Sequence, residues 1–500
     1  MKPLRIFIFL TTVALWLFMI ALIFPRQGIS ITPDFQLKFI DLSTLTDKET
    51  ASKDKLVEQM VAASMVTADP EEGFDPGGVT ITETTGVTGG PGAAGEVIDT
   101  GGISIPLVSP ANADSLKRAV CRIRFSEGGS GLLDPFFFKL KGLLDGSVAR
   151  SRIMHFGDSQ IENDRMTALI RYRLQRQFGG SGAGLVPAIP LYWGNLAYEQ
   201  EEEGDWMRHT FFGSRDSLVT HNAYGVMGAF ASVPMSEEES RPRIQYRFNT
   251  SRRTGRFDRV RLFMHSYVEG ASMAVVVNDT LTDSIRNLPD GFSVADYRHH
   301  AGVKELSLSM DFPEGGRIYG ISFESYLGLQ MDNIAMRGGS GLIFTKMNRE
   351  LQLRMFEILS PGLIILQYGG NVVPYITPGF YQRAFKRELA LIRELCPGVP
   401  VIVIGPSDMS MKEKGKFVTY PGLEPVRDAL KNAALESGFA FWDLYEAMGG
   451  YNSMASFVHA DPPLAFPDYV HFTPVGVNLV AEMFYNALMV EYNSYSSQNR

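Results

Sequence analysis

The sequence has little cysteine. Its 500 residues include only Cys121 and Cys396, which excludes a disulfide-dense scaffold. The two cysteines form no Cys-x-x-Cys pair, so a structural zinc site is not expected. They are either two free thiols in the core or, in an oxidising compartment, one disulfide.

Clustered positive charge is also missing. The formal net charge is −8, and no block of lysine and arginine occurs beyond the N-terminus. Proteins that bind nucleic acid concentrate such residues against the phosphates, so we expect no nucleic-acid partner. The hydrophobic and charged fractions are those of an ordinary globular protein, and the length predicts more than one domain.

Charge is absent from one long apolar run, residues 6–24, which follows a lysine and an arginine. At about 1.5 Å per residue, a helix of this length nearly spans a hydrocarbon core about 30 Å thick. The positive flank favours a cytoplasmic N-terminus. We therefore predict a transmembrane anchor over 1–27, with everything after it exported. The alternative is a cleaved signal peptide and a secreted protein, although Pro25-Arg26-Gln27 is not a small-residue cleavage site.

Large apolar side chains are scarce in residues 28–112. Glycine, proline and threonine dominate 67–110, as in GVTGGPGAAG. Such a composition cannot supply a hydrophobic core, and we predict a disordered or stalk segment over 28–112.

The region that follows changes its periodicity twice. Residues 113–204 and 329–492 alternate short buried strands with amphipathic helices, as in RIMHF and NDRMTALIRYRLQRQF, which indicates a mainly parallel sheet. Residues 205–328 contain short alternating runs such as SMAVVVND and VKELSLSMDF, separated by turn residues. That pattern is typical of an antiparallel β-sandwich. We predict an α/β domain in two parts, 113–204 and 329–492, interrupted by a sandwich over 205–328.

A serine follows the first strand in MHFGDSQ, where Asp158-Ser159 marks a tight turn before a helix expected from Ile161 onward. The carboxyl edge of a parallel sheet is where such folds place their sites. The helix N-terminus and the serine N–H would favour a developing negative charge. A serine hydroxyl is a weak nucleophile that needs a base and oxyanion donors. The alternative is that Ser159 only caps the helix.

One of the eight histidines has a carboxylate at a useful spacing. In FPDYVHFTP, Asp468 precedes His471 by three residues, so a single turn of chain can bring the carboxylate and the imidazole together. Thr473-Pro474 is typical of an N-cap and a first helical position. We therefore predict His471 as the base and Asp468 as the group that orients it.

Glycines and an asparagine that follow strands are candidates for the oxyanion hole. LIILQYGGN ends a strongly apolar strand at Asn371, whose side-chain amide is a hydrogen-bond donor. MRGGSGLIF contains a glycine cluster, residues 338–341, where a backbone N–H can be exposed. The alternative for each is a plain turn.

In this order on an α/β chain, the GDS turn, the glycine block, Gly-x-Asn and Asp-x-x-His resemble the motifs of the SGNH (GDSL-like) hydrolases. These are esterases and acyl hydrolases with a three-layer α/β/α fold. The resemblance implies that Ser159 is the nucleophile and first oxyanion donor. It implies further donors at Gly341 and Asn371, the catalytic pair Asp468 and His471, and no cofactor or metal.

Two positions depart from that pattern: Gln160 replaces the usual leucine, and Val372 replaces an aspartate. Neither removes a catalytic group, so they concern the subfamily. An exported domain interrupted by a sandwich resembles the bacterial peptidoglycan O-acetylesterases with an inserted carbohydrate-binding-like module. That resemblance implies removal of acetyl groups from glycan of the bacterial cell envelope. The anchor would then lie in the inner membrane and the catalytic region in the periplasm or outside.

Three alternatives stay open. An O-acetyltransferase would use the same residues with a sugar in place of water. A lipid esterase would need an apolar acyl groove, which no stretch of the sequence requires. A glycan-binding protein would keep only a vestigial site. Trp206, Tyr267 and Tyr297 of the insert could stack on sugar rings, or they could be core or ordinary surface.

Overall fold

The computed structural model describes residues 29–32, 35–37, 122–192, 194–213, 219–233, 235, 241–248, 254–299 and 302–498. The predicted anchor, most of the predicted stalk and Cys121 lie outside them. In the described part of the chain, no helix combines the length and apolarity needed to cross a membrane. Strands β1 (Ile29–Thr32) and β2 (Phe35–Leu37) pair antiparallel, so the start of the predicted stalk segment does contain secondary structure. Apolar and polar residues alternate in both strands, as expected of a hairpin.

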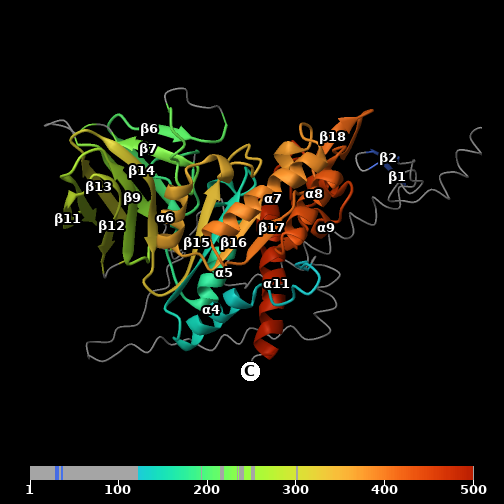
Figure 1. The fold of residues 1–500 in the computed structure, drawn as a ribbon, viewed down its shortest axis with the longest axis horizontal. Coiled ribbons are helices and arrows are strands. Elements are labelled where there is room, and N and C mark those ends of the chain that lie inside the picture. The colour runs from blue at the N-terminus through green and yellow to red at the C-terminus, as the bar shows by residue number, and fades with distance from the viewer. Residues whose placement is uncertain are drawn as a thin grey trace, which may run out of the picture.

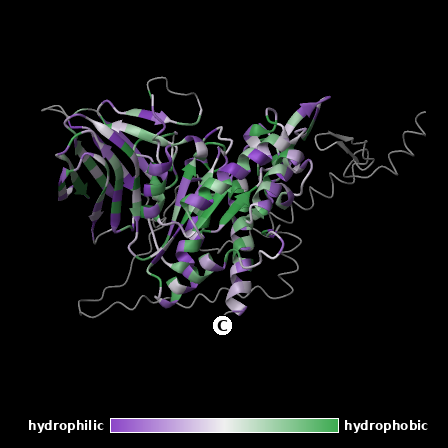
Figure 2. Cartoon of the chain, in the orientation of Figure 1, coloured by the Kyte–Doolittle hydropathy of each residue, from purple (hydrophilic) through white to green (hydrophobic). Residues whose placement is uncertain are grey.

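Five parallel strands form the centre of the α/β domain, in the order β15-β3-β16-β17-β20. Their bounds are β3 Arg150–Gly157, β15 Gly328–Ala335, β16 Leu363–Gln367, β17 Val401–Ile404 and β20 Ala440–Trp442. Every residue of β16 and β17 is buried, as expected for strands covered on both faces. Figure 2 shows this sheet as the most hydrophobic part of the domain. The predicted parallel α/β architecture is confirmed.

Helices cover both faces of the sheet (Figure 1). Successive side chains of β3 point to opposite faces, so Ile153 and Met154 belong to different cores. The Ile153 side is covered by α4 (Asp134–Asp145), α5 (Thr167–Phe178) and α11 (Pro474–Gln498), with the short α9 (Leu444–Ala447) and α10 (Ser453–His459). The Met154 side is covered by α6 (Arg349–Leu359), α7 (Pro378–Leu395) and α8 (Leu423–Glu436). The arrangement is the predicted three-layer one.

Two antiparallel sheets pack together beside this domain. One has the order β11-β10-β13-β8-β5, and the other has the order β12-β9-β14-β7-β6 with β4 also paired to β14. Buried side chains such as Tyr246, Leu262 and Val275 form the core between them. The strands are β4 Gly184–Val186, β5 Tyr198–Glu203, β6 Met207–Thr210, β7 Ala229–Val233, β8 Arg243–Phe248, β9 Arg259–Ser266, β10 Ala271–Val277, β11 Thr280–Leu288, β12 Gly291–Arg298, β13 Glu305–Asp311 and β14 Gly316–Glu324.

The two sheets include strands that precede the predicted boundary at residue 205. Both β4 and β5 belong to them. The sequence of β5, YEQEEE, has only one apolar residue, so it lacks the alternation that identifies a strand. It is an edge strand, and Glu201 forms an exposed ion pair with Arg247 of β8.

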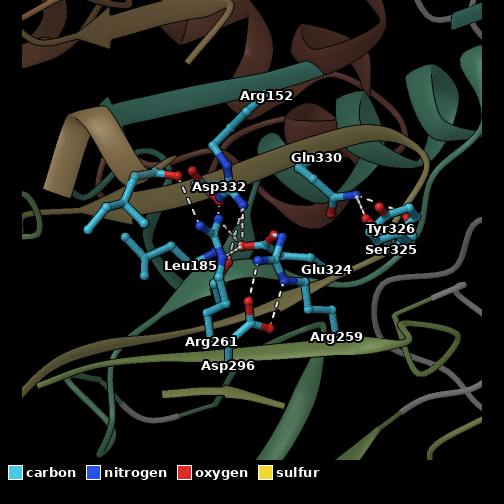
Figure 3. Close-up of polar contacts among 12 residues, drawn as sticks. Arg152, Leu185, Arg259, Arg261, Asp296, Glu324, Ser325, Tyr326, Gln330 and Asp332 are labelled. Carbon is cyan, nitrogen blue, oxygen red and sulfur yellow. Dashed lines mark hydrogen bonds and ion pairs between the residues drawn. The ribbon is translucent and has the colours of Figure 1, made fainter. Parts of the chain in front are cut away.

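A cluster of buried charges joins the sandwich to the parallel sheet (Figure 3). Arg152 on β3 donates hydrogen bonds to Asp332 on β15 and to Glu324 on β14. Arg261 on β9 also pairs with Glu324, and Asp332 accepts from the Leu185 N–H at 2.7 Å. Burial opposes ionisation of Glu324, but the two guanidinium groups outweigh it and lower its pKa to about 2.

Arg152→Met should lower the free energy of unfolding by roughly 3–5 kcal/mol, because it leaves two buried carboxylates without their shared partner. Urea denaturation followed by circular dichroism would measure the change. Arg349→Met is the matched control, since it breaks an exposed pair with Glu394 and should leave the urea midpoint unchanged. Equal shifts in both variants would contradict the role given to the cluster.

Candidate active site

The turn after β3 presents Ser159 at the carboxyl edge of the sheet. Gly157 ends the strand where a Cβ atom would lie 3.1 Å from the Gln367 carbonyl oxygen, too close for most side chains. Asp158 Oδ1 then accepts from the Gln160 N–H at 3.0 Å and closes the turn. Within the described residues the Ser159 N–H has no acceptor, so it is available to an oxyanion.

The helix that follows begins later than predicted. The chain first forms a 3₁₀ turn, η2 (Glu162–Asp164), and α5 starts at Thr167 rather than at Ile161. Met166 has a φ of 55°, outside the helical region, which prevents an earlier start. Ser159 is therefore not the N-cap of α5, and the predicted helix N-terminus directly after the serine is wrong.

The structure brings the three predicted catalytic residues together, although Ser159 and His471 are 312 positions apart in the sequence. His471 Nδ1 lies 2.8 Å from Asp468 Oδ2, and His471 Nε2 lies 3.3 Å from Ser159 Oγ. Because the carboxylate accepts the Nδ1 proton, Nε2 is left to accept from the serine hydroxyl. This is the relation of nucleophile, base and orienting acid that activates a serine.

Local backbone contacts keep Asp468 ionised. Its Oδ1 accepts from the N–H groups of Val470 and His471, both at 3.0 Å. Burial opposes ionisation, but these bonds and the contact with the imidazole outweigh it, so the pKa of Asp468 is below its ordinary value. The carboxylate is thus ionised at neutral pH, as an acceptor of the Nδ1 proton must be.

Asn371 lies beside the turn that carries Ser159. It belongs to η5 (Gly370–Val372), directly after β16, and lines the same cavity as Ser159. Its Nδ2 donates to Asp158 Oδ2 at 3.0 Å and to the Gly339 carbonyl oxygen at 3.3 Å. An oxyanion near Ser159 can replace the longer of these two contacts while Asp158 keeps the amide oriented.

The structure does not place Gly341 in that cavity. Gly341 has a φ of 75°, and a Cβ atom there would lie 2.8 Å from the ring of Tyr368 and 2.9 Å from the ring of Phe385. Packing therefore accounts for this glycine. The member of the glycine cluster that reaches Asn371 is Gly339, through its carbonyl oxygen. The position of Gly341 does not support its predicted role as a donor.

Sequence reasoning missed the contacts that Gln160 and Asp158 make. Gln160 Nε2 donates to the Val470 carbonyl oxygen at 2.9 Å. This bond links the serine turn, residues 158–160, to the histidine loop, residues 468–471. Burial raises the pKa of Asp158 to about 6, and its two oxygens hold Gln160 and Asn371. The only signal for either residue was the departure of Gln160 from the family pattern.

Two cavities lie near the turn that follows β3. One of about 90 Å³ is next to Ser159 and is lined by Gly370, Asn371, Pro406 and Met409 among others. The larger, of about 810 Å³, is lined by residues of the sandwich and the α/β domain and by none of the three catalytic candidates. The smaller cavity is therefore the space in which a group attached to Ser159 would lie.

Of the three aromatic residues considered for sugar stacking, only one is well exposed. Tyr267 is 44% exposed, and its hydroxyl accepts from Arg317 Nε at 2.9 Å. Tyr297 is 4% exposed and belongs to the sandwich core, so of the two alternatives it is a core residue and not one that can stack on a sugar. Trp206 is half-buried, and its indole N–H donates to the Glu203 carbonyl oxygen.

A scan against models of known families finds no match for this sequence, and no curated protein matches it. Among solved structures, a peptidoglycan O-acetylesterase aligns with a TM-score of 0.60 at 20% identity, covering 72% of this chain and 96% of that chain. A family two carbohydrate esterase from Clostridium thermocellum aligns with a TM-score of 0.23 at 11% identity over 56% of this chain and 97% of that chain, too low to carry an argument. The first likeness is one of fold, and it confirms the architecture that the motifs implied.

Ser159 should react with phenylmethylsulfonyl fluoride, because Asp468 and His471 activate its hydroxyl. Mass spectrometry of the treated protein would locate the sulfonyl group. His471→Ala should abolish the reaction, and Asp468→Asn should slow it less. Modification of another serine, or an unchanged rate in His471→Ala, would contradict this assignment.

Gln160→Leu should slow the same reaction by roughly tenfold, because the Val470 carbonyl loses its donor and the histidine loop is no longer tied to the serine turn. Gln160→Glu is the second variant, and it tests whether the hydrogen-bond donor matters. It keeps the size of the side chain but replaces the donor with an acceptor, so its rate should be no higher than that of Gln160→Leu. A wild-type rate in both variants would show that the link is dispensable.

Proposed function

We propose that this protein is an exported serine esterase that removes O-acetyl groups from cell-envelope glycan such as peptidoglycan. The observation that carries the proposal is the hydrogen-bonded series Ser159, His471 and Asp468 beside a small cavity. We infer export from the apolar N-terminal run. We infer a glycan substrate from the peptidoglycan O-acetylesterase that shares the fold. In this proposal the protein lies in the bacterial envelope, held by the anchor predicted over residues 1–27.

The geometry supports a two-step mechanism. Ser159 Oγ attacks the acetyl carbonyl carbon while His471 Nε2 takes the hydroxyl proton, and the tetrahedral oxyanion accepts from the Ser159 N–H and the Asn371 amide. The intermediate collapses as His471 returns the proton to the departing sugar oxygen. Water, activated by His471, then attacks the acetyl-serine and releases acetate and free Ser159.

The size of the cavity supports a short acyl group. About 90 Å³ is well below the roughly 300–1,000 Å³ of pockets that enclose drug-sized ligands. An acetyl group fits such a space, whereas a long acyl chain would have to extend beyond it. Proline and methionine in the lining provide apolar contacts for one methyl group. A lipid esterase is less well supported for this reason.

The arrangement of the sandwich supports a polymeric substrate. Exposed Tyr267 contacts Arg317, whose guanidinium lies over the ring at 5.3 Å from its centre, and His265, whose ring is 5.7 Å away. An exposed aromatic ring with hydrogen-bond donors beside it is suited to a sugar with polar substituents. In this proposal the sandwich holds glycan and the small cavity receives one acetyl group at a time.

Hydrolysis of p-nitrophenyl esters should decline steeply with chain length. We expect kcat/KM for the acetate to exceed that for the octanoate by at least tenfold, because the cavity admits only a short acyl group. Release of acetate from O-acetylated peptidoglycan, measured with an acetate assay, tests the glycan directly. Ser159→Ala should abolish both activities.

A preference for octanoate over acetate would favour the lipid-esterase alternative. Transfer of acetyl groups to an added sugar faster than to water would favour the transferase. Activity that persists in a folded Ser159→Ala protein would overturn the proposed nucleophile.

A further inference from the structure

A hairpin outside the sheet holds the loop that carries the catalytic histidine. Strands β18 (Ser410–Glu413) and β19 (Lys416–Thr419) pair antiparallel soon after β17, and Figure 1 shows β18 projecting beyond the helices around it. The segment between β17 and β18 includes Pro406, Ser407 and Met409, which line the small cavity beside Ser159. The hairpin is therefore continuous with one wall of the site.

The hairpin contacts the histidine loop through a pair of stacked rings. The rings of Phe417 and Tyr469 lie 3.5 Å apart between centres, with an interplanar angle of 9°. Tyr469 stands between Asp468 and His471 in the sequence. A backbone hydrogen bond adds to this contact, because the Ser410 N–H donates to the Tyr469 carbonyl oxygen at 3.0 Å.

Tyr469 needs such support because its backbone is strained. It has a φ of 59°, a conformation that a bulky residue adopts only when the surrounding structure imposes it. The same turn allows Asp468 Oδ1 to accept from the Val470 and His471 N–H groups. Relaxation of Tyr469 would therefore disturb the contact between the carboxylate and the imidazole.

The hairpin is firmly anchored at its base. Asp408 is fully buried, and its two oxygens accept from Thr419 Oγ1 at 2.8 Å and from the Met454 N–H at the start of α10 at 2.7 Å. The Thr419 N–H donates to Asn452 Oδ1 at 2.9 Å, and the Asn452 N–H donates back to Thr419 Oγ1. Phe417 thus lies on a hairpin whose base is held by buried hydrogen bonds, although the residue is 37% exposed.

We propose that Phe417 is a positioning residue for catalysis: by stacking on Tyr469, it keeps His471 within reach of Ser159. The inference rests on the proposed function, since it concerns the same catalytic groups. The separation of 3.3 Å between His471 Nε2 and Ser159 Oγ is at the long end for a hydrogen bond. A further displacement of the loop by about 1 Å would cost roughly a hundredfold in rate.

The test compares Phe417→Ala, Phe417→Tyr and Phe138→Ala in the full chain. Phe138→Ala is the matched control because it removes an exposed phenylalanine ring from α4. For p-nitrophenyl acetate, we expect kcat of Phe417→Ala to fall by roughly 10- to 100-fold with KM within about twofold. The rate of Ser159 sulfonylation by phenylmethylsulfonyl fluoride should fall by the same factor. Phe417→Tyr, which keeps the planar ring, should restore both rates.

The proposal is overturned if Phe417→Ala keeps kcat within twofold of wild type, or if Phe138→Ala loses as much. Thermal melting shows whether each variant is folded. If Phe417→Ala is unfolded, Phe417→Leu replaces it, because leucine keeps apolar volume without a ring and should still lower kcat. Failure of the proposed function is a separate result, since it would appear as the absence of acetate release from O-acetylated peptidoglycan by the wild-type protein.

Discussion

The guanidinium of Arg152 is the group on which the arrangement of the two parts of this protein depends. It lies on β3, the strand that leads to Ser159, and both Asp332 of the neighbouring strand and Glu324 of the sandwich accept its hydrogen bonds. Burying these charges costs free energy, and the cost is offset only when all the partners are in place. The cluster therefore disfavours any orientation of the sandwich against the sheet in which one of these partners is missing.

The charge cluster and the candidate active site lie at different ends of β3. Arg152 is near the beginning of the strand, while Ser159 follows its end at the carboxyl edge of the sheet. The sandwich is inserted between β3 and β15, which are neighbours in the sheet with Arg150 opposite Gly328. A long insert can therefore enter and leave the domain without separating the strands that build the site. The charge cluster holds the insert near the beginning of β3, whereas the proposed catalytic residues lie on loops at the carboxyl edge of the sheet.

The local parts of the site were predictable from sequence, and the parts set by packing were not. The spacing of Asp468 and His471 lets one turn join them, and the glycine before Asp158 predicts a tight turn, so both features follow from a few adjacent residues. The glycine cluster offers several equivalent positions, and only the rings of Tyr368 and Phe385 decide where Gly341 lies. Strands β16 and β17 of the parallel sheet were predictable because they are nearly continuous apolar runs, whereas β5 was not, because an acidic edge strand has no such run.

The buried carboxylate of Asp158 connects the serine turn to two other segments of the chain. Asp158 binds the Gln160 backbone through one oxygen and the Asn371 amide through the other, and Gln160 in turn reaches the Val470 carbonyl oxygen. The serine turn, the predicted oxyanion donor Asn371 and the histidine loop are thus held by contacts that begin at a residue adjacent to Ser159. Burial raises the pKa of Asp158 to about 6, so its charge is maintained at neutral pH against a cost of desolvation. A group held under such conditions contributes to the geometry of the site more than to the stability of the fold. In the proposed mechanism Asp158 therefore acts by orienting its neighbours and takes no part in proton transfer.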